Sequence, residues 1–138
     1  MQKEDVIDLI RDAGFGLLAT TEKGGKQPRV RPMMPYLTED GRLLVALLER
    51  SRTIEQVKEN PLVEVCFVDR KMWYARVTGK AKESTNKDDK AILWDNIPML
   101  RQYFGGADDT GFKMLEVEIV DVEAMTPHQK LPEKLSIK

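Results

Sequence analysis

Residues 49–61, ERSRTIEQVKENP, combine residue types that could bind an anion. Arg50 and Arg52 stand at the start of a short amphipathic helix, where the positive end of the helix macrodipole disfavours cations. A phosphate at the same place would be favoured by the helix dipole and by guanidinium groups alike. We therefore interpret Ser51, Arg52 and Thr53 as a candidate phosphate site.

A purely structural interpretation of this segment needs no ligand. Thr53 would cap the helix and Gln56 would complete a T-x-x-Q capping box, with the arginines simply solvated. The two interpretations are compatible, because Thr53 can cap the helix and still line an anion site. Arg31, in the extended segment 28–38, could add a second guanidinium fork.

Other kinds of catalytic site find little support. The single histidine, His128, has no partner at ligand spacing, so we predict no metal site. The single cysteine, Cys66, lies in the apolar run VEVCFV and is predicted to be a buried thiol. GGADDTG (105–111) lacks both P-loop and dinucleotide-binding spacing. If the protein is an enzyme, we expect a bound organic cofactor to supply the chemistry.

Length and composition predict a cytoplasmic single domain. The chain has 138 residues, enough for one core. Its 22 Lys+Arg and 23 Asp+Glu leave a net charge of −1, so no bulk attraction to nucleic acid is expected. The apolar runs are too short to span a membrane, and the N-terminus lacks the apolar block of a signal peptide.

Hydrophobic periodicity predicts a mostly β chain. Helices are expected over 4–13, within 49–61 and over 86–104, the last in two pieces broken near Pro98. Six strands are expected over 15–21, 28–38, 42–48, 62–68, 72–84 and 112–125.

The turn signals between these strands predict how they pair. The tight turn EDG should join 28–38 and 42–48 into a hairpin, with a bulge or sheet edge at Pro32 and Pro35. Short antiparallel strands favour a closed or nearly closed barrel, and a two-layer α+β sandwich is the alternative. The tail, 126–138, shows no period and is expected to wrap a neighbouring subunit or to be mobile.

Three segments in this order, FGLLATTEKGGKQPRVRPMMPY, DGRLLVALLERSRTIEQVKENPLVEVCFVD and WYARVTGKAKE, resemble the pyridoxamine 5′-phosphate oxidase superfamily of FMN-binding split barrels. The resemblance covers roughly residues 4–122. Its most specific part is the Ser-Arg-Thr block followed by Asn-Pro and a strand, preceded by R-x-R-P. The second half, ILWDNIPMLRQYFGGADDTGFKMLEVEI, resembles the general-stress-protein branch, and the first half also resembles the nitroimidazole-reductase-type branch.

The resemblance implies a fold, a cofactor and an assembly. The fold is mainly β (α+β), a six-stranded antiparallel split β-barrel with short peripheral helices over residues 1–125. The implied cofactor is FMN, bound at the interface of a homodimer. The implied activity is hydride or electron transfer between a nicotinamide or other donor and a small-molecule acceptor. The second chain is expected to contribute side chains from Ile92, Leu93, Trp94 and Tyr103.

The resemblance also implies which residues contact FMN. They are Arg31, Pro32, Met33, Met34, Ala46, Leu47, Ser51, Arg52, Thr53 and Arg76. Arg31 would reach the phosphate or the ribityl chain, and the Ser-Arg-Thr block would clamp the phosphate. The Pro-Met-Met run and the Ala-Leu pair would flank the isoalloxazine ring. Arg76 falls, with a one-residue shift, on a family Gln that approaches the ring.

Some positions depart from the oxidase pattern. Thr53 replaces a lysine of the phosphate clamp, for which Arg50 or Arg29 could compensate, and Tyr36 replaces the lysine that ends the flavin strand. The tail TPHQKLPEKLSIK lacks the Trp and Arg that hold pyridoxine phosphate, which argues against vitamin B6 oxidation. Two alternatives are a non-catalytic flavin- or haem-binding stress protein and a binder of a deazaflavin.

Overall fold

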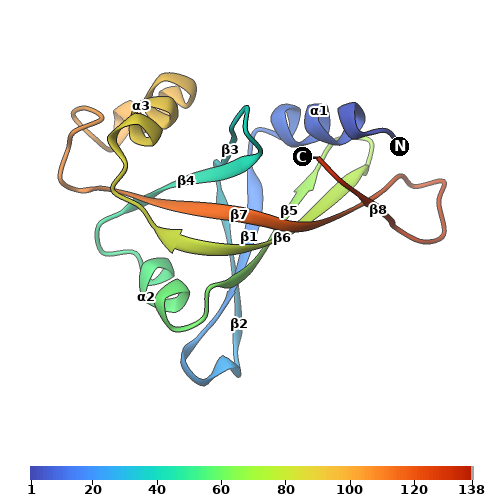
Figure 1. Cartoon of the computed structure of the whole chain (residues 1–138), viewed down its shortest axis with the longest axis horizontal. Coiled ribbons are helices and arrows are strands. Elements are labelled where there is room, and N and C mark those ends of the chain that lie inside the picture. Colours follow the sequence, from blue (N-terminus) through green and yellow to red (C-terminus); the bar gives the residue numbers. More distant parts are fainter. Residues whose placement is uncertain (138) are drawn as a thin grey trace.

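One antiparallel sheet, curled into a half-barrel, forms the body of the protein (Figure 1). The computed structural model describes residues 1–137, except the side chain of Lys23; Lys138, the end of the predicted tail, lies outside the described residues. The strands are β1 (Gly16–Thr21), β2 (Pro28–Met33), β3 (Tyr36–Leu37), β4 (Arg42–Leu48), β5 (Leu62–Val68), β6 (Tyr74–Glu83), β7 (Phe112–Met125) and β8 (Glu133–Leu135). The predicted mainly β fold with peripheral helices is confirmed, with an eight-stranded sheet instead of six strands.

The order of the strands explains why the sheet curls. Neighbouring strands follow the order β2-β1-β5-β6-β7-β4-β3, and β8 pairs with β7. β2 and β3 therefore lie at opposite ends of the order, yet only Met34 and Pro35 separate them in sequence. So short a link requires the two ends of the sheet to approach each other. The sequence predicted a closed or nearly closed barrel. The structure has a curled sheet, and the short link between β2 and β3 explains the curl.

The predicted hairpin between 28–38 and 42–48 is wrong for most of its length. β2 pairs with β1 across the turn that contains Gly24 and Gly25, and only β3 pairs with β4. The extended stretch breaks at Pro35, whose nitrogen has no hydrogen to donate to a ladder. The break transfers the chain from one end of the sheet to the other.

Within residues 1–137, five short helical segments surround the sheet. They are α1 (Lys3–Ala13), η1 (Lys23–Gly25), α2 (Arg52–Glu59), α3 (Lys87–Asn96) and η2 (Pro98–Gln102). α1 buries Val6, Leu9 and Ile10 against the sheet; it ends at Gly14, whose φ of 77° favours glycine. The break between α3 and η2 falls at Pro98, as predicted. Among these described helices, none has the length and apolar character needed to cross a membrane.

Over the part of the chain that the structure describes, the buried apolar residues form two clusters. The larger lies inside the curled sheet and is covered by α1 and α2. The smaller lies between the sheet and the α3–η2 segment, and it contains Leu44, Leu93, Leu100, Phe104 and Phe112. In this second cluster the rings of Phe104 and Phe112 stack with centroids 4.9 Å apart. The second cluster thus fixes the position of η2 over β4 and β7.

The tail packs on its own chain over the residues described. β8 pairs with the end of β7, and Ile137 is buried in the larger cluster. The amino group of Met1 lies 3.4 Å from the Glu133 carboxylate. A strand of three residues is too short to show alternation, which explains why the sequence predicted no regular structure here.

Candidate functional site

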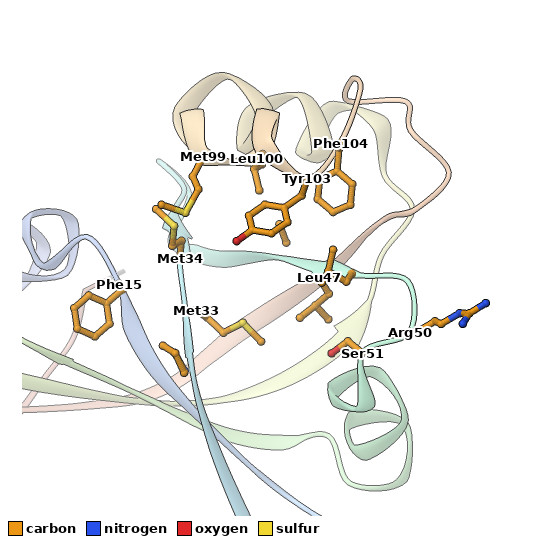
Figure 2. Close-up of a pocket in the computed structure, with 13 residues that line it drawn as sticks. Phe15, Met33, Met34, Leu47, Arg50, Ser51, Met99, Leu100, Tyr103 and Phe104 are labelled. Atoms are coloured by element: carbon orange, nitrogen blue, oxygen red, sulfur yellow. The ribbon is translucent and has the colours of Figure 1, made fainter.

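An apolar groove of about 610 Å³ opens between the end of β2, the end of β4, the start of α2 and the η2 segment. Figure 2 shows Met99, Leu100, Tyr103 and Phe104 on one side, with Met33 and Ser51 opposite them. The lining residues are Phe15, Pro32, Met33, Met34, Ala46, Leu47, Leu48, Arg50, Ser51, Met99, Leu100, Tyr103 and Phe104. The volume is typical of a site for a small molecule or cofactor.

The structure brings six of the predicted site residues together in this groove. They are Pro32, Met33, Met34, Ala46, Leu47 and Ser51. The register of β3 on β4 explains part of this grouping, since Tyr36 lies opposite Leu44 and the same register continued places Met34 near Ala46. Arg31, Arg52 and Thr53 are sequence neighbours of groove residues, although their own side chains do not line it.

Ser51 is the N-cap of α2. Its hydroxyl oxygen accepts a hydrogen bond from the backbone N–H of Thr53, with an N–O distance of 3.2 Å. The expected capping box of Thr53 and Gln56 is therefore wrong, because the helix begins at Arg52 and the Thr53 side chain points inward with 3% exposure. The Arg52 side chain is exposed at the first position of the helix.

Arg31 is held by three uncharged acceptors. Its Nη1 donates to the carbonyl oxygen of Leu18 at 3.3 Å and to the hydroxyl of Thr20 at 2.8 Å. Its Nη2 donates to Oε1 of Gln56 at 2.6 Å. Burial lowers the pKa of this guanidinium, and the nearby charge of Arg29 lowers it further; the group still remains protonated. Within the described residues no carboxylate lies within ion-pair distance of Arg31.

Thr20 and Gln56 are functional candidates that the sequence interpretation missed. Both side chains are buried, and the Thr20 hydroxyl donates to Gln56 Oε1 at 2.5 Å. A signal was present, since Thr20 alternates with outward residues of a strand and Gln56 lies beside Ile54 and Val57 on the buried face of α2. Polar residues on buried faces need partners, but the sequence could not show that Arg31 is the partner.

The two arginines expected to compensate for the missing lysine have different surroundings. Arg29 donates through Nε to Glu22 at 2.6 Å, which lowers the pKa of that carboxyl, and the charges of Arg29 and Arg52 lower it further. Arg29 is thereby already paired. Arg50 lines the groove, and Figure 2 shows its guanidinium extending outward beside the start of α2.

Arg76 and Cys66 lie on the outward face of the sheet and do not line this groove. Arg76 lies opposite Cys66 in the β5–β6 register, and its Nη2 is 2.7 Å from the Glu123 carboxylate. The expectation of a buried Cys66 is wrong: its neighbours Val65 and Phe67 point inward, so Cys66 points outward and is half-buried. The flavin contact expected of Arg76 stays a prediction.

The residues expected from a second chain have roles in their own chain. Tyr103 lines the groove described above, and Leu93 is fully buried in the second cluster. Trp94 lies against Arg101, whose guanidinium carbon is 4.6 Å from the ring centroid. Met99, Leu100 and Phe104, which line the groove beside Tyr103, were not predicted as part of the site, since they are far from Met33 and Met34 in sequence.

Comparison with known proteins supports the fold. The chain is 28% identical over 145 residues to General stress protein 26 of Bacillus subtilis (strain 168), covering 98% of this chain and 96% of that protein. The structure of General Stress Protein 26 from Bacillus anthracis str. Sterne has a TM-score of 0.81 at 24% identity, covering 96% of each chain. A pyridoxamine 5′-phosphate oxidase-related, FMN binding protein from Nostoc punctiforme PCC 73102 has a TM-score of 0.71 at 17% identity, covering 95% of this chain and 85% of that one.

The family itself follows from the sequence match. The pattern of the family described as pyridoxamine 5′-phosphate oxidase matches residues 3–126. This range contains the whole groove, the strand that carries Arg31 and the helix capped by Ser51. The chain therefore belongs to the pyridoxamine 5′-phosphate oxidase family.

Proposed function

We propose that the protein is an FMN-dependent oxidoreductase that transfers hydride or electrons between a nicotinamide or other donor and a small-molecule acceptor. One observation carries the proposal. An apolar groove ends at Ser51, the cap of α2, and the same helix holds Arg31 through Gln56, with no carboxylate paired to that cation among the described residues. An apolar cleft next to available cationic and hydroxyl donors suits a ligand with a planar ring and a phosphate.

The residues present fit FMN. Ser51 uses its oxygen to cap the helix, so its hydroxyl hydrogen can donate to a phosphate, and Arg52 is exposed beside it. The thioethers of Met33 and Met34 and the side chain of Leu47 offer an apolar surface to a ring. When bound, FMN would supply two-electron redox chemistry, while this chain would anchor the phosphate and shield the ring from water. The Nostoc relative named as FMN binding supports this assignment.

A homodimer with FMN at the interface is part of the proposal. The outward faces of β1, β2 and β5 expose Leu17, Val30 and Leu62, and the adjacent strands make these positions one surface. Exposed apolar surface of this kind is typical of protein interfaces. Arg76 lies on the same outward face, one strand further along. In a dimer it could approach the FMN of the partner subunit.

One observation favours a second candidate, a non-catalytic flavin carrier. The groove lining contains no carboxylate, imidazole or amine, and its polar side chains are Arg50, Ser51 and Tyr103. A carrier needs no proton-transfer group. Reduction of bound FMN by NADH or NADPH, followed by reoxidation with an added quinone, would exclude the carrier.

Native mass spectrometry of the purified protein tests the cofactor directly. We expect one FMN per subunit in a dimer. A folded protein that arrives without flavin and binds no added FMN would contradict the proposal. A haem or deazaflavin mass in place of FMN would identify a different ligand for the same groove.

A further inference from the structure

We infer that Gln56 makes this site selective for a phosphorylated flavin, because it orients the Arg31 guanidinium without neutralising its charge. The inference rests on the proposed function, since it concerns the phosphate end of the same site. Gln56 is a positioning residue in this account: it acts through Arg31 and contacts no part of the flavin ring.

Gln56, Thr20 and Arg31 form a closed ring of hydrogen bonds. Gln56 Oε1 accepts from Arg31 Nη2 at 2.6 Å and from the Thr20 hydroxyl at 2.5 Å, and that hydroxyl accepts from Arg31 Nη1 at 2.8 Å. A guanidinium has only donors, so the amide oxygen and not the amide nitrogen must face Arg31. Gln56 is 8% exposed and Thr20 is 2% exposed, which leaves the ring little freedom to rearrange.

The ring occupies one edge of the guanidinium and leaves another edge available. A guanidinium has five N–H donors, and three hydrogen bonds to Leu18, Thr20 and Gln56 use both hydrogens of Nη1 and one of Nη2. Nε–H and the second Nη2 hydrogen have no acceptor among residues 1–137. Two parallel N–H donors on one edge are the arrangement that binds a phosphate in a bidentate manner.

The location of the ring directs Arg31 toward the start of α2. Gln56 is four positions after Arg52 and three after Thr53, so the three residues share one side of the helix. Helical side chains lean toward the N-terminus. The guanidinium bound to Gln56 therefore lies near the first turn, where backbone N–H groups and the Ser51 hydroxyl also favour an anion.

The uncharged character of Gln56 distinguishes Arg31 from other arginines of this chain. Arg29, Arg42 and Arg76 each contact a carboxylate at 2.6 to 2.9 Å. Arg31 is half-buried and meets amide, hydroxyl and carbonyl oxygens only. A half-buried cation without a counter-ion is unfavourable, so a bound dianion would stabilise it. A glutamate at this position would have the same shape as Gln56 but would supply that negative charge permanently.

The test compares FMN with riboflavin, which lacks the phosphate, by titration of the folded apoprotein. We expect Gln56→Glu to weaken FMN binding by about 10- to 100-fold, because a carboxylate paired with Arg31 would weaken the bond from Arg31 to the phosphate. This range corresponds to the loss of one hydrogen bond to a charged group. Riboflavin affinity and the unfolding temperature should not fall, because the introduced carboxylate would still accept from Arg31. Gln56→Met, which keeps the length without the acceptor, should also lower FMN affinity selectively. Gln102→Glu, the same charge change at an exposed position of η2 outside the groove lining, should alter neither affinity.

Inorganic phosphate separates this inference from the proposed function. It should raise the unfolding temperature of the wild type and not that of Gln56→Glu. If the wild type binds no flavin but shows this phosphate effect, the proposed function fails, and only the role of Gln56 in orienting Arg31 toward a phosphate stands. Wild-type FMN affinity in folded Gln56→Glu, or equal losses of FMN and riboflavin, would overturn the inference. An absence of phosphate stabilisation together with no flavin binding would overturn both.

Discussion

Thr53 shows how one residue shapes the proposed phosphate site around it. It occupies the position of a lysine in the oxidase pattern, but its side chain is 3% exposed and packs at the base of α2. An ammonium group buried there without a partner would be strongly unfavourable. In the proposed site, anion binding at this helix is therefore left to Ser51, Arg52 and Arg31. In the proposed site, the ring of Thr20, Gln56 and Arg31 would compensate for the missing lysine, because it holds one guanidinium in place.

The reactivity of the Cys66 thiol can also be predicted from its surroundings. Burial raises the pKa of its thiol above the ordinary value of 9.0, and the Glu64 carboxylate raises it further. The thiol should therefore stay protonated and unreactive at neutral pH. We expect iodoacetamide to alkylate the native protein more slowly than the urea-unfolded chain. Above pH 9.0 the native rate should go on rising, because the pKa of the native thiol is raised from that value. Equal rates in the two states at neutral pH would contradict this account of Cys66.

The loop after η2 depends on one carboxylate. Asp109 accepts hydrogen bonds from the backbone N–H groups of Gly105 and Gly111, both at 2.9 Å, and these bonds lower its pKa below the ordinary 3.8. Because the folded-state pKa is lowered, the stabilisation is present above 3.8 and is lost as the pH falls through the folded value. Asp109→Asn should lower the unfolding temperature at neutral pH, with a smaller difference in strong acid. If the difference in unfolding temperature between Asp109→Asn and the wild type did not change with pH, this role of the Asp109 carboxylate would be contradicted.

The η2 wall depends on the second apolar cluster. Phe112 is fully buried and stacks on Phe104, the neighbour of Tyr103. Phe112→Ala should reduce the free energy of unfolding by about 3 to 5 kcal/mol, through lost transfer energy and a residual cavity. Urea unfolding measures this, and Val120→Ala, at an exposed position of β7, should change stability by less than about 0.5 kcal/mol. A Phe112→Ala effect as small as that of the control would show that η2 does not depend on this stack.

At the scale of the whole molecule, the proposed dimer makes the outward face of β1, β2 and β5 essential. Val30 is 63% exposed there, and Leu17 lies on the neighbouring strand. We expect Leu17→Glu/Val30→Glu to sediment as a folded monomer with weaker FMN binding, because charges inside an apolar interface cannot be paired. Leu131→Glu, at an exposed position before β8, is the matched control and should remain dimeric. A wild-type monomer, or a dimeric double variant, would contradict the proposal.

Local patterns predicted the elements well and their partners less well. Apolar runs located β1, β4 and β5, alternation located β6 and β7, and helical spacing located α1 and α2. The split of 28–38 between two ends of the sheet was missed, since Pro35 marks a break but not the strand that each half will join. β8 was missed because three residues cannot show a period.

Site residues were predictable where they lie on segments whose order along the chain resembles that of the family. Met33, Met34, Ala46, Leu47 and Ser51 were expected together, and the structure places them in one groove. Contacts that only the tertiary fold creates were not predictable. The bond from Arg31 to Gln56 joins β2 to α2, and Tyr103 reaches the groove because the second cluster holds η2 in position. Such contacts depend on distances between elements, which residue types along one segment do not encode.

The most direct test of the central claim is a titration of FMN into the apoprotein of Arg31→Ala/Arg52→Ala, with the wild type and Arg70→Ala as references. Arg70 is exposed on the turn before β6, so its replacement should leave FMN affinity unchanged. The double variant should remain folded and bind FMN at least about 100-fold more weakly, because it loses charge-assisted bonds from two guanidinium groups. A folded double variant that binds FMN with wild-type affinity would contradict the claim that these residues anchor the flavin phosphate.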